Sequence, residues 1–337
     1  MPALIARRLL QLPIILAVIY SLTLFLAWKV PGNPLENPEG RKPPPAVVEA
    51  MKRQYKLDSF GNFYWSYLES ATGLKWVGDM FSGRAAEART LAAQSGQARP
   101  ERYIFDLGPS LKNPDWRVNQ IIADSLPVSM TLGLAAILIA LVLGLGAGVI
   151  GAVRPNSFAD LSTLAIALVG ISMPSFVIGT ALVLIFPVWL GIGSLGGWGT
   201  VGKLVLPALT LSLPFAAYIA RLTRMGMVEH LRADFIRTAR AKGVDEWTTI
   251  SKHAFRNTLI PVVTVLGITL SLLIGGSVVI EQVFALPGIG RLIVQGILAR
   301  DYPLVQGTML LFGFAFVVIN IMVDIIYTFV DPRVRYG

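Results

Sequence analysis

Long uncharged apolar runs dominate the pattern of hydrophobic and polar residues along this chain. Twenty uncharged residues follow Arg8, 29 follow Asp124 and 42 follow Asp160. A helix rises about 1.5 Å per residue, so about 20 apolar residues cross a hydrocarbon layer roughly 30 Å thick. The pattern predicts six membrane-spanning helices, over residues 9–29, 126–152, 161–187, 204–227, 259–281 and 303–329.

The 42-residue run is long enough for two helices, but two observations favour one. Residues 191–202 contain six glycines, which suit a loop better than a helix facing lipid. Six spans with a cytoplasmic N-terminus place 13 basic residues in the inside segments and three in the two short outside loops. A seventh span would put the most basic loop outside, against the usual distribution of Lys and Arg.

Composition supports a membrane protein and excludes several classes of function. Hydrophobic residues make up 54% of the chain and charged residues 15%, against about 25% charged residues in soluble domains. There is no cysteine, which excludes disulfides, thiolate metal sites and a cysteine nucleophile. The net charge of +9 lies in loops between spans, so we expect no nucleic-acid partner. The first apolar run exceeds a signal-peptide core and is predicted to be retained.

One large segment, residues 31–124, follows the first span and is predicted to be extracytoplasmic. It begins rich in proline, continues with helical spacing of apolar residues, and includes an aromatic stretch over 60–67 that suits the outer membrane interface. Residues 82–102 have the composition of a flexible insertion. The predicted organisation is an N-terminal tip and first helix (1–30), this segment (31–124), a core of membrane-spanning helices (125–330) and a cytoplasmic C-terminus (331–337).

Glycine-rich motifs invite nucleotide-binding interpretations that fail on their details. Gly197, Gly202 and Lys203 have P-loop spacing, but Leu204 stands where a Ser or Thr must hold magnesium. Gly144 and Gly148 have the spacing at which two helices approach closely in lipid. We therefore expect no cofactor at these positions.

Catalytic and ion-coupled chemistry is poorly supported. The only histidines, His230 and His253, lie in a predicted cytoplasmic loop, so a membrane-embedded serine would lack a base. No catalytic or metal-binding residue is predicted. Ion-coupled transport needs ionisable groups along the path, whereas Glu281 and Asp324 lie near span ends. Asp324 is predicted to be a structural charge near the cytoplasmic face, paired with an arginine such as Arg221 or Arg224.

The cytoplasmic loop 228–258 carries the most specific pattern. It combines apolar and cationic residues, and Gly243 allows a turn between two short helices. The segment Asp234-Phe-Ile-Arg-Thr-Ala-Arg-Ala-Lys-Gly243 resembles the EAA loop of ABC-importer permeases, in the form found in dipeptide, oligopeptide and nickel permeases. Arg237-Thr238-Ala239 occupy the Glu-Ala-Ala positions, a departure typical of the peptide branch.

Further segments match that branch in the right order. They are Val30-Pro-Gly-Asn-Pro34, Asp124-Ser-Leu-Pro-Val-Ser-Met-Thr-Leu132, Glu281-Gln-Val-Phe-Ala-Leu-Pro-Gly-Ile-Gly290, Arg300-Asp-Tyr-Pro303 and Asp331-Pro-Arg-Val-Arg-Tyr336. The resemblance covers residues 1–34 and about 119–337, and residues 82–118 have no clear counterpart.

The resemblance implies an all-α integral membrane protein of the bacterial cytoplasmic membrane, with the transmembrane fold of type I ABC importers and both termini cytoplasmic. The implied partners are a second, homologous permease forming a heterodimer, two cytoplasmic ABC ATPase subunits, an extracytoplasmic substrate-binding protein and membrane lipid. Coupling to the ATPases is expected at Asp234, Arg237, Thr238, Ala239, Arg240 and Gly243. The permease would hydrolyse no ATP itself.

The implied function is translocation of peptides or peptide-like solutes by alternating access, driven by the ATPases. Two alternatives stay open at this point: an ion-coupled secondary transporter, and an ABC importer for nickel chelates. The sequence leaves open whether the substrate is a dipeptide, an oligopeptide, a peptide antibiotic or a nickel chelate.

Overall fold

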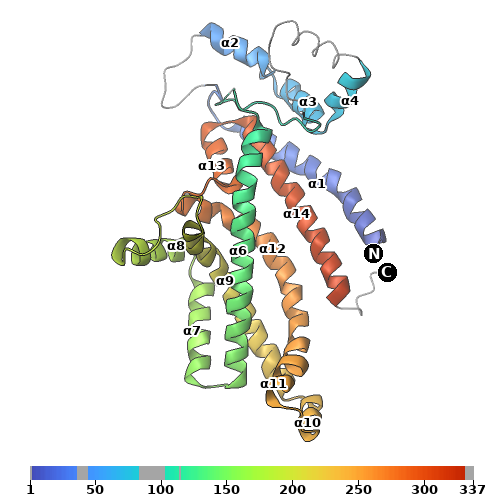
Figure 1. Ribbon diagram of the computed structural model, residues 1–337. Coiled ribbons are helices and arrows are strands. Elements are labelled where there is room, and N and C mark those ends of the chain that lie inside the picture. Colours follow the sequence, from blue (N-terminus) through green and yellow to red (C-terminus); the bar gives the residue numbers. More distant parts are fainter. Residues whose placement is uncertain (1, 36–44, 83–102, 114, 331–337) are drawn as a thin grey trace. The chain divides into compact units, whose positions relative to one another are not determined.

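The computed structural model describes residues 2–35, 45–82, 103–113 and 115–330 (Figure 1). Apart from one antiparallel bridge between Pro109 and Arg117, the regular structure of these residues is helical. The long helices are α1 (Pro2–Lys29), α6 (Val118–Val153), α9 (Val201–Leu231), α12 (Arg256–Val283) and α14 (Tyr302–Val330). The shorter ones are α2 (Pro45–Gln54), α3 (Phe60–Ala71), α4 (Leu74–Phe81), α7 (Phe158–Ser172), α8 (Ser175–Val183), α10 (Asp234–Ala241), α11 (Glu246–Thr248) and α13 (Ile289–Ala299), with π-helical segments η1 (Leu184–Trp189) and η2 (Thr249–Phe255).

The all-helical membrane fold expected from the sequence is confirmed. Among the described residues, four helices are long and apolar enough to cross a membrane: Ala6–Lys29, Val118–Val153, Val201–Leu231 and Tyr302–Ile325. A bent pair of shorter helices raises the number to five if it forms one span. The predicted span 259–281 lies within α12. The number of six spans stays a prediction. The predicted C-terminal segment 331–337 and the insertion beyond Ser82 fall outside the described residues.

The span expected over residues 161–187 is a bent pair of helices. Helix α7 ends at Ser172, and the axis of the following helix, Ser175–Trp189, is turned by 110°. Pro174 has no N–H to donate, and its ring forces the preceding residue out of helical conformation. Met173 accordingly has extended backbone angles, φ −95° and ψ 134°. A proline inside an apolar run thus decides the direction of the chain.

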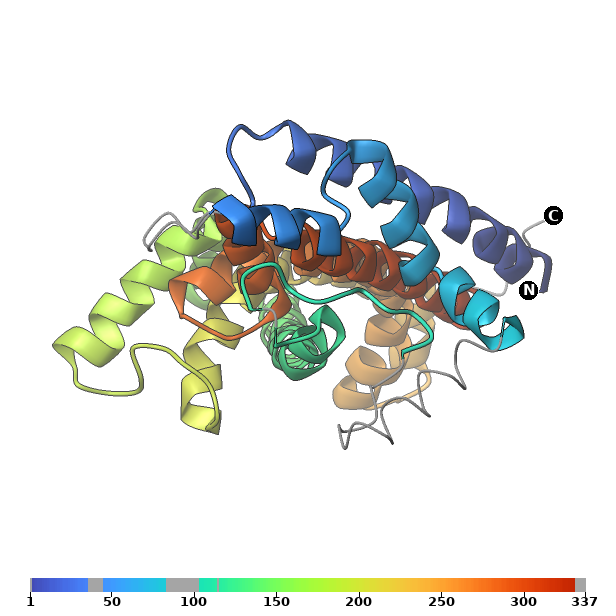
Figure 2. The ribbon, with the colours of Figure 1, turned by 90° about the horizontal axis from the view of Figure 1, so that it is seen from above.

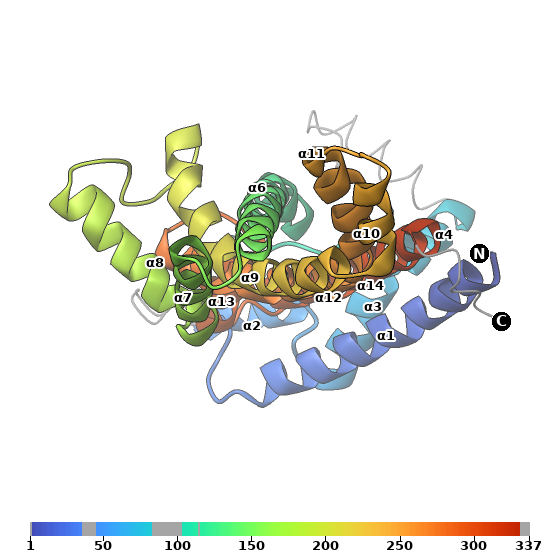
Figure 3. The same cartoon turned by 90° about the horizontal axis from the view of Figure 1, so that it is seen from below.

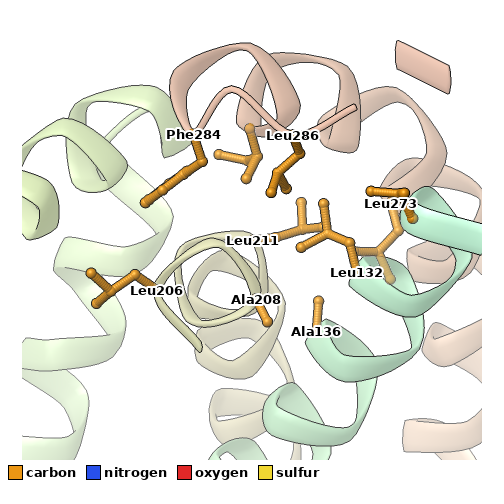
Figure 4. Close-up of a cluster of buried hydrophobic side chains, with 10 residues drawn as sticks. Leu132, Ala136, Leu206, Ala208, Leu211, Leu273, Phe284 and Leu286 are labelled. Atoms are coloured by element: carbon orange, nitrogen blue, oxygen red, sulfur yellow. The ribbon is translucent and has the colours of Figure 1, made fainter. Parts of the chain in front are cut away.

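The chain divides into two compact units, each described here by itself. Unit 1 comprises Met1–Pro13, Leu126–Arg291 and Phe314–Gly337. Its core lies between α6, α9 and α12, where leucines meet Phe284 and Leu286 from the loop after α12 (Figure 4). Helices α6 and α9 approach so closely at Gly148 that a Cβ added there would lie 2.7 Å from the Ala220 carbonyl oxygen. The predicted packing role of the small residues is confirmed.

Unit 2 comprises Ile14–Ser125 and Leu292–Gly313. Asp301 is its buried polar centre, because the carboxylate accepts hydrogen bonds from the Ser110 hydroxyl and from the backbone N–H groups of Leu111 and Leu304. The expected interface aromatics are mostly internal: Phe63 and Tyr67 are buried. This packing joins the segment after α1 to the first turn of α14.

Candidate functional site

The turn after α10 is built as a glycine-terminated helix end. Gly243 has φ +77°, and its N–H donates to the Arg240 carbonyl. The next N–H, of Val244, donates to the Ala239 carbonyl at 3.2 Å. These two bonds are those of the Schellman motif, in which a left-handed residue satisfies the last helical carbonyls. Positive φ at Gly243 confirms the sharp exit turn expected from the sequence.

Charged groups then fix where the next helix begins. The Asp245 carboxylate accepts the Thr248 N–H at 3.0 Å and so caps α11. Hydrogen bonds from Thr248, from its side chain and then from its backbone, lower the pKa of Asp245. Arg240 forms a two-pronged pair with Glu246, at 3.1 and 2.5 Å, and lowers the pKa of that carboxyl. The turn is therefore held from both sides.

The apolar stripe of α10 packs on the chain's own helices. Ile236 and Ala239 are its buried residues, and Ile236 packs with Met227 of α9, Ala254 of η2 and Ala152 of α6. Ala239, one of the residues expected to couple to the ATPases, is only 8% exposed, and its part in the coupling stays a prediction. A stripe at i and i+3 on a short helix has to be buried, and the nearest apolar surface belongs to the same unit.

The outer side of the α10–α11 hairpin, meaning residues 234–248, is open and carries two exposed aromatics. Phe235 is 43% exposed and Trp247 is 76% exposed. Asp234, Arg237 and Thr238 of the predicted set are exposed as well, with Arg237 and Asp234 3.6 Å apart. Trp247 was missed from the sequence. The available signal was a large apolar residue directly after Asp245 and Glu246.

The hairpin lies at the end of unit 1 where α6 turns into α7 (Figures 1 and 3). Near that turn the buried Asp160 of α7 holds Arg224 of α9 through bonds of 2.5 and 2.7 Å. The sequence analysis had suggested Arg224 as a partner of Asp324, but Arg224 is bound to Asp160 instead. Asp324 instead pairs with Arg8 of α1 at 3.0 Å. The sequence separation of this pair, 316 residues, is the reason that local reasoning missed it.

Within the described part of the chain, no group of three or more His, Asp or Glu side chains is placed to hold a metal ion. Of the P-loop-like glycines, Gly197 lies in the loop before α9, where its N–H donates to the Phe284 carbonyl at 2.9 Å, and Gly202 lies in α9. The Lys203 ammonium donates to the Trp198 carbonyl at 3.3 Å.

Solved structures identify the class of this fold. The chain is similar to the methionine ABC transporter MetNI in inward-facing conformations, with a TM-score of 0.53 and 21% identity over 63% of this chain and 97% of that chain. At this identity the likeness concerns the fold. It is the transmembrane fold of a type I ABC importer, as the sequence predicted.

The family follows from sequence comparison. A model described as "Binding-protein-dependent transport system inner membrane component" matches residues 140–336. The chain is 42% identical over 346 residues, all of both proteins, to a Brucella abortus protein described as "Putative peptide transport system permease protein". It is 37% identical to the dipeptide permease DppB of Bacillus subtilis (94% of this chain, 93% of that protein) and to the oligopeptide permease OppB of Escherichia coli (98% and 99%).

The chain therefore belongs to the family of binding-protein-dependent inner membrane transport components. It is a permease subunit of the ABC-importer class, in the peptide branch, and a multi-pass inner membrane protein.

Proposed function

We propose that this permease imports peptides or peptide-like solutes by alternating access. The observation that carries the proposal is the full-length similarity, at 37% identity or more, to relatives whose descriptions all name peptide, dipeptide or oligopeptide transport. Energy comes from two ATPase subunits, so the permease hydrolyses no ATP. A second permease completes the pore, and a binding protein delivers the solute. Both termini lie in the cytoplasm, and residues 31–124 lie outside it.

The α10–α11 hairpin is the docking element for the ATPase in this proposal. Its inner side is packed on α6, α9 and η2, so a force on the hairpin reaches the spanning helices directly. Its outer side offers Phe235, Trp247 and the exposed polar residues Asp234, Arg237 and Thr238. Exposed aromatics with a polar surround are typical of protein contact sites.

Uptake into proteoliposomes tests the function. The complete importer should take up a labelled tripeptide when ATP is supplied to the ATPase side, and uptake should stop without ATP while a proton or sodium gradient is maintained. Uptake that follows the gradient would make the protein a secondary transporter. Competition by chelated nickel, with none by peptides, would assign it to nickel import instead.

A second measurement tests the docking element. Trp247→Ala should weaken co-purification of the ATPase by about 2 kcal/mol, roughly 30-fold in affinity, if Trp247 is a central contact. Trp189→Ala is the matched control, because Trp189 is equally exposed but lies in η1. Equal ATPase binding by both variants would contradict the proposed role of the hairpin.

A further inference from the structure

Helix α4 has its polar side turned toward the protein and its apolar side turned outward. Lys75, Gly78 and Asp79 line a cavity of about 640 Å³ within unit 2. On the other side, Met80 is 63% exposed and Phe81 is 87% exposed. A surface helix in water has the reverse arrangement, with its apolar stripe on the core. Among the described residues of the unit, nothing covers the outer side of α4.

The exposed apolar surface extends beyond α4. Ile104 and Phe105 are both exposed and lie beside Gly73, the residue that precedes the helix. A Cβ on Gly73 would be 3.4 Å from the Ile104 side chain and 3.7 Å from the Phe105 ring. A contiguous apolar surface of this kind marks a contact with protein or membrane rather than with water.

Helix α3, which leads into α4, packs on the membrane-spanning helix α1 (Figure 2). At the start of α3, the Phe60 ring lies 5.7 Å from that of Trp28. One turn later, the Tyr64 carbonyl accepts a 2.6 Å hydrogen bond from the Tyr20 hydroxyl. The two contact points on α1 are eight residues apart, about 12 Å of helix. The first turn of α3 therefore packs against α1 between Tyr20 and Trp28.

We propose that α4 is an interfacial helix whose Val77, Met80 and Phe81 side chains enter the membrane leaflet in which α1 ends. Helices of this type lie about 5–10 Å deep, at the boundary between headgroups and acyl chains. Helix α3, which leads into α4, packs on α1, and the exposed Leu22 and Leu26 of α1 belong to a helix long and apolar enough to cross a membrane. This attachment to a spanning helix favours lipid over a protein partner. The role of α4 is to hold the segment after α1 against the membrane.

The absence of cysteine from the chain allows a direct test. Spin labels are attached to Met80→Cys and Phe81→Cys in the full-length permease, reconstituted in vesicles of phosphatidylethanolamine and phosphatidylglycerol. Lys75→Cys, on the polar side of the same helix, is the matched control. Collisions of the label with oxygen, which is enriched in lipid, and with a water-soluble nickel chelate are measured. Thermal unfolding of each labelled variant shows that it is folded.

The expected result is loss of nickel-chelate collisions at positions 80 and 81, with frequent oxygen collisions, while position 75 stays accessible to the chelate. Chelate access at all three positions would show that α4 lies in water and would overturn the proposal. Few collisions with either reagent at 80 and 81 would indicate burial against protein and would overturn it as well. The test depends only on α1 spanning the membrane, so its outcome is independent of which solute the permease imports.

Discussion

Replacing Gly243 isolates the energetic contribution of one backbone conformation. Its φ of +77° costs an L-residue roughly 1–2 kcal/mol, and more if the side chain is β-branched. No heavy atom lies within 4 Å of a Cβ placed there, so steric clashes add nothing. Asn tolerates left-handed conformation better than Ala or Val. We therefore expect the hairpin to weaken in the order Gly, Asn, Ala, Val, by about 1 kcal/mol for Ala and about 2 kcal/mol for Val.

Hydrogen exchange of residues 234–255 in the purified permease measures this weakening. A loss of about 1.4 kcal/mol raises the population of the open hairpin roughly tenfold, and exchange that depends on opening accelerates by the same factor. The Gly243→Val variant should also lose ATPase stimulation in liposomes while still pairing with its permease partner. In both assays Gly243→Asn should remain the variant closest to the native protein.

Gly133→Ala is the matched control. Gly133 also has open space around a Cβ, but it lies inside α6 with ordinary helical angles, so alanine should be neutral or stabilising by about 0.5–1 kcal/mol. Equal exchange rates for Gly243→Val and the native protein would refute the reasoning. Equal acceleration by Asn and Val would refute it too, because a general effect of side-chain size would then replace the conformational one.

Other predictions concern charges and topology. Asp324→Asn should lower stability by about 1 kcal/mol, since the pair with Arg8 is partly exposed, and a charge exchange between the two positions should recover part of the loss in thermal unfolding. Asp160→Asn should cost more, about 3–5 kcal/mol, because it leaves a partly buried arginine without its partner; a thermal transition close to that of the native protein would contradict this. A reporter fused after Gly243 should read cytoplasmic and one near Gln94 external, and an external signal at Gly243 would refute the proposed orientation.

The α10–α11 hairpin shows how far local sequence reasoning reaches. A glycine after a short amphipathic segment indicates a left-handed helix end, and the structure confirms it at Gly243. The local sequence pattern did not predict what the apolar side chains of α10 pack against. Ile236 is buried because Met227, Ala254 and Ala152 converge on it, and those residues come from three different helices. The exposure of Trp247 follows from the same packing.

The sequence by itself determined the class of this protein. Apolar runs long enough to cross a bilayer, separated by basic loops, indicate membrane-spanning helices. In lipid each backbone polar group must be satisfied within the protein, and a helix does this within its own segment. Family motifs then narrowed the class to a peptide-branch ABC permease. These features are local, since each depends on residues close together in the chain.

Only the tertiary structure decided which distant groups meet. The pairing of Asp324 with Arg8, the pairing of Asp160 with Arg224, and the hydrogen bonds from Ser110 and Leu111 to Asp301 join residues from different parts of the sequence. Several arginines were equally suitable partners by charge, and their choice depended on how the helices pack. The 110° turn at Pro174 lies between these cases, because a proline predicts a break but its angle is set by the helices around it.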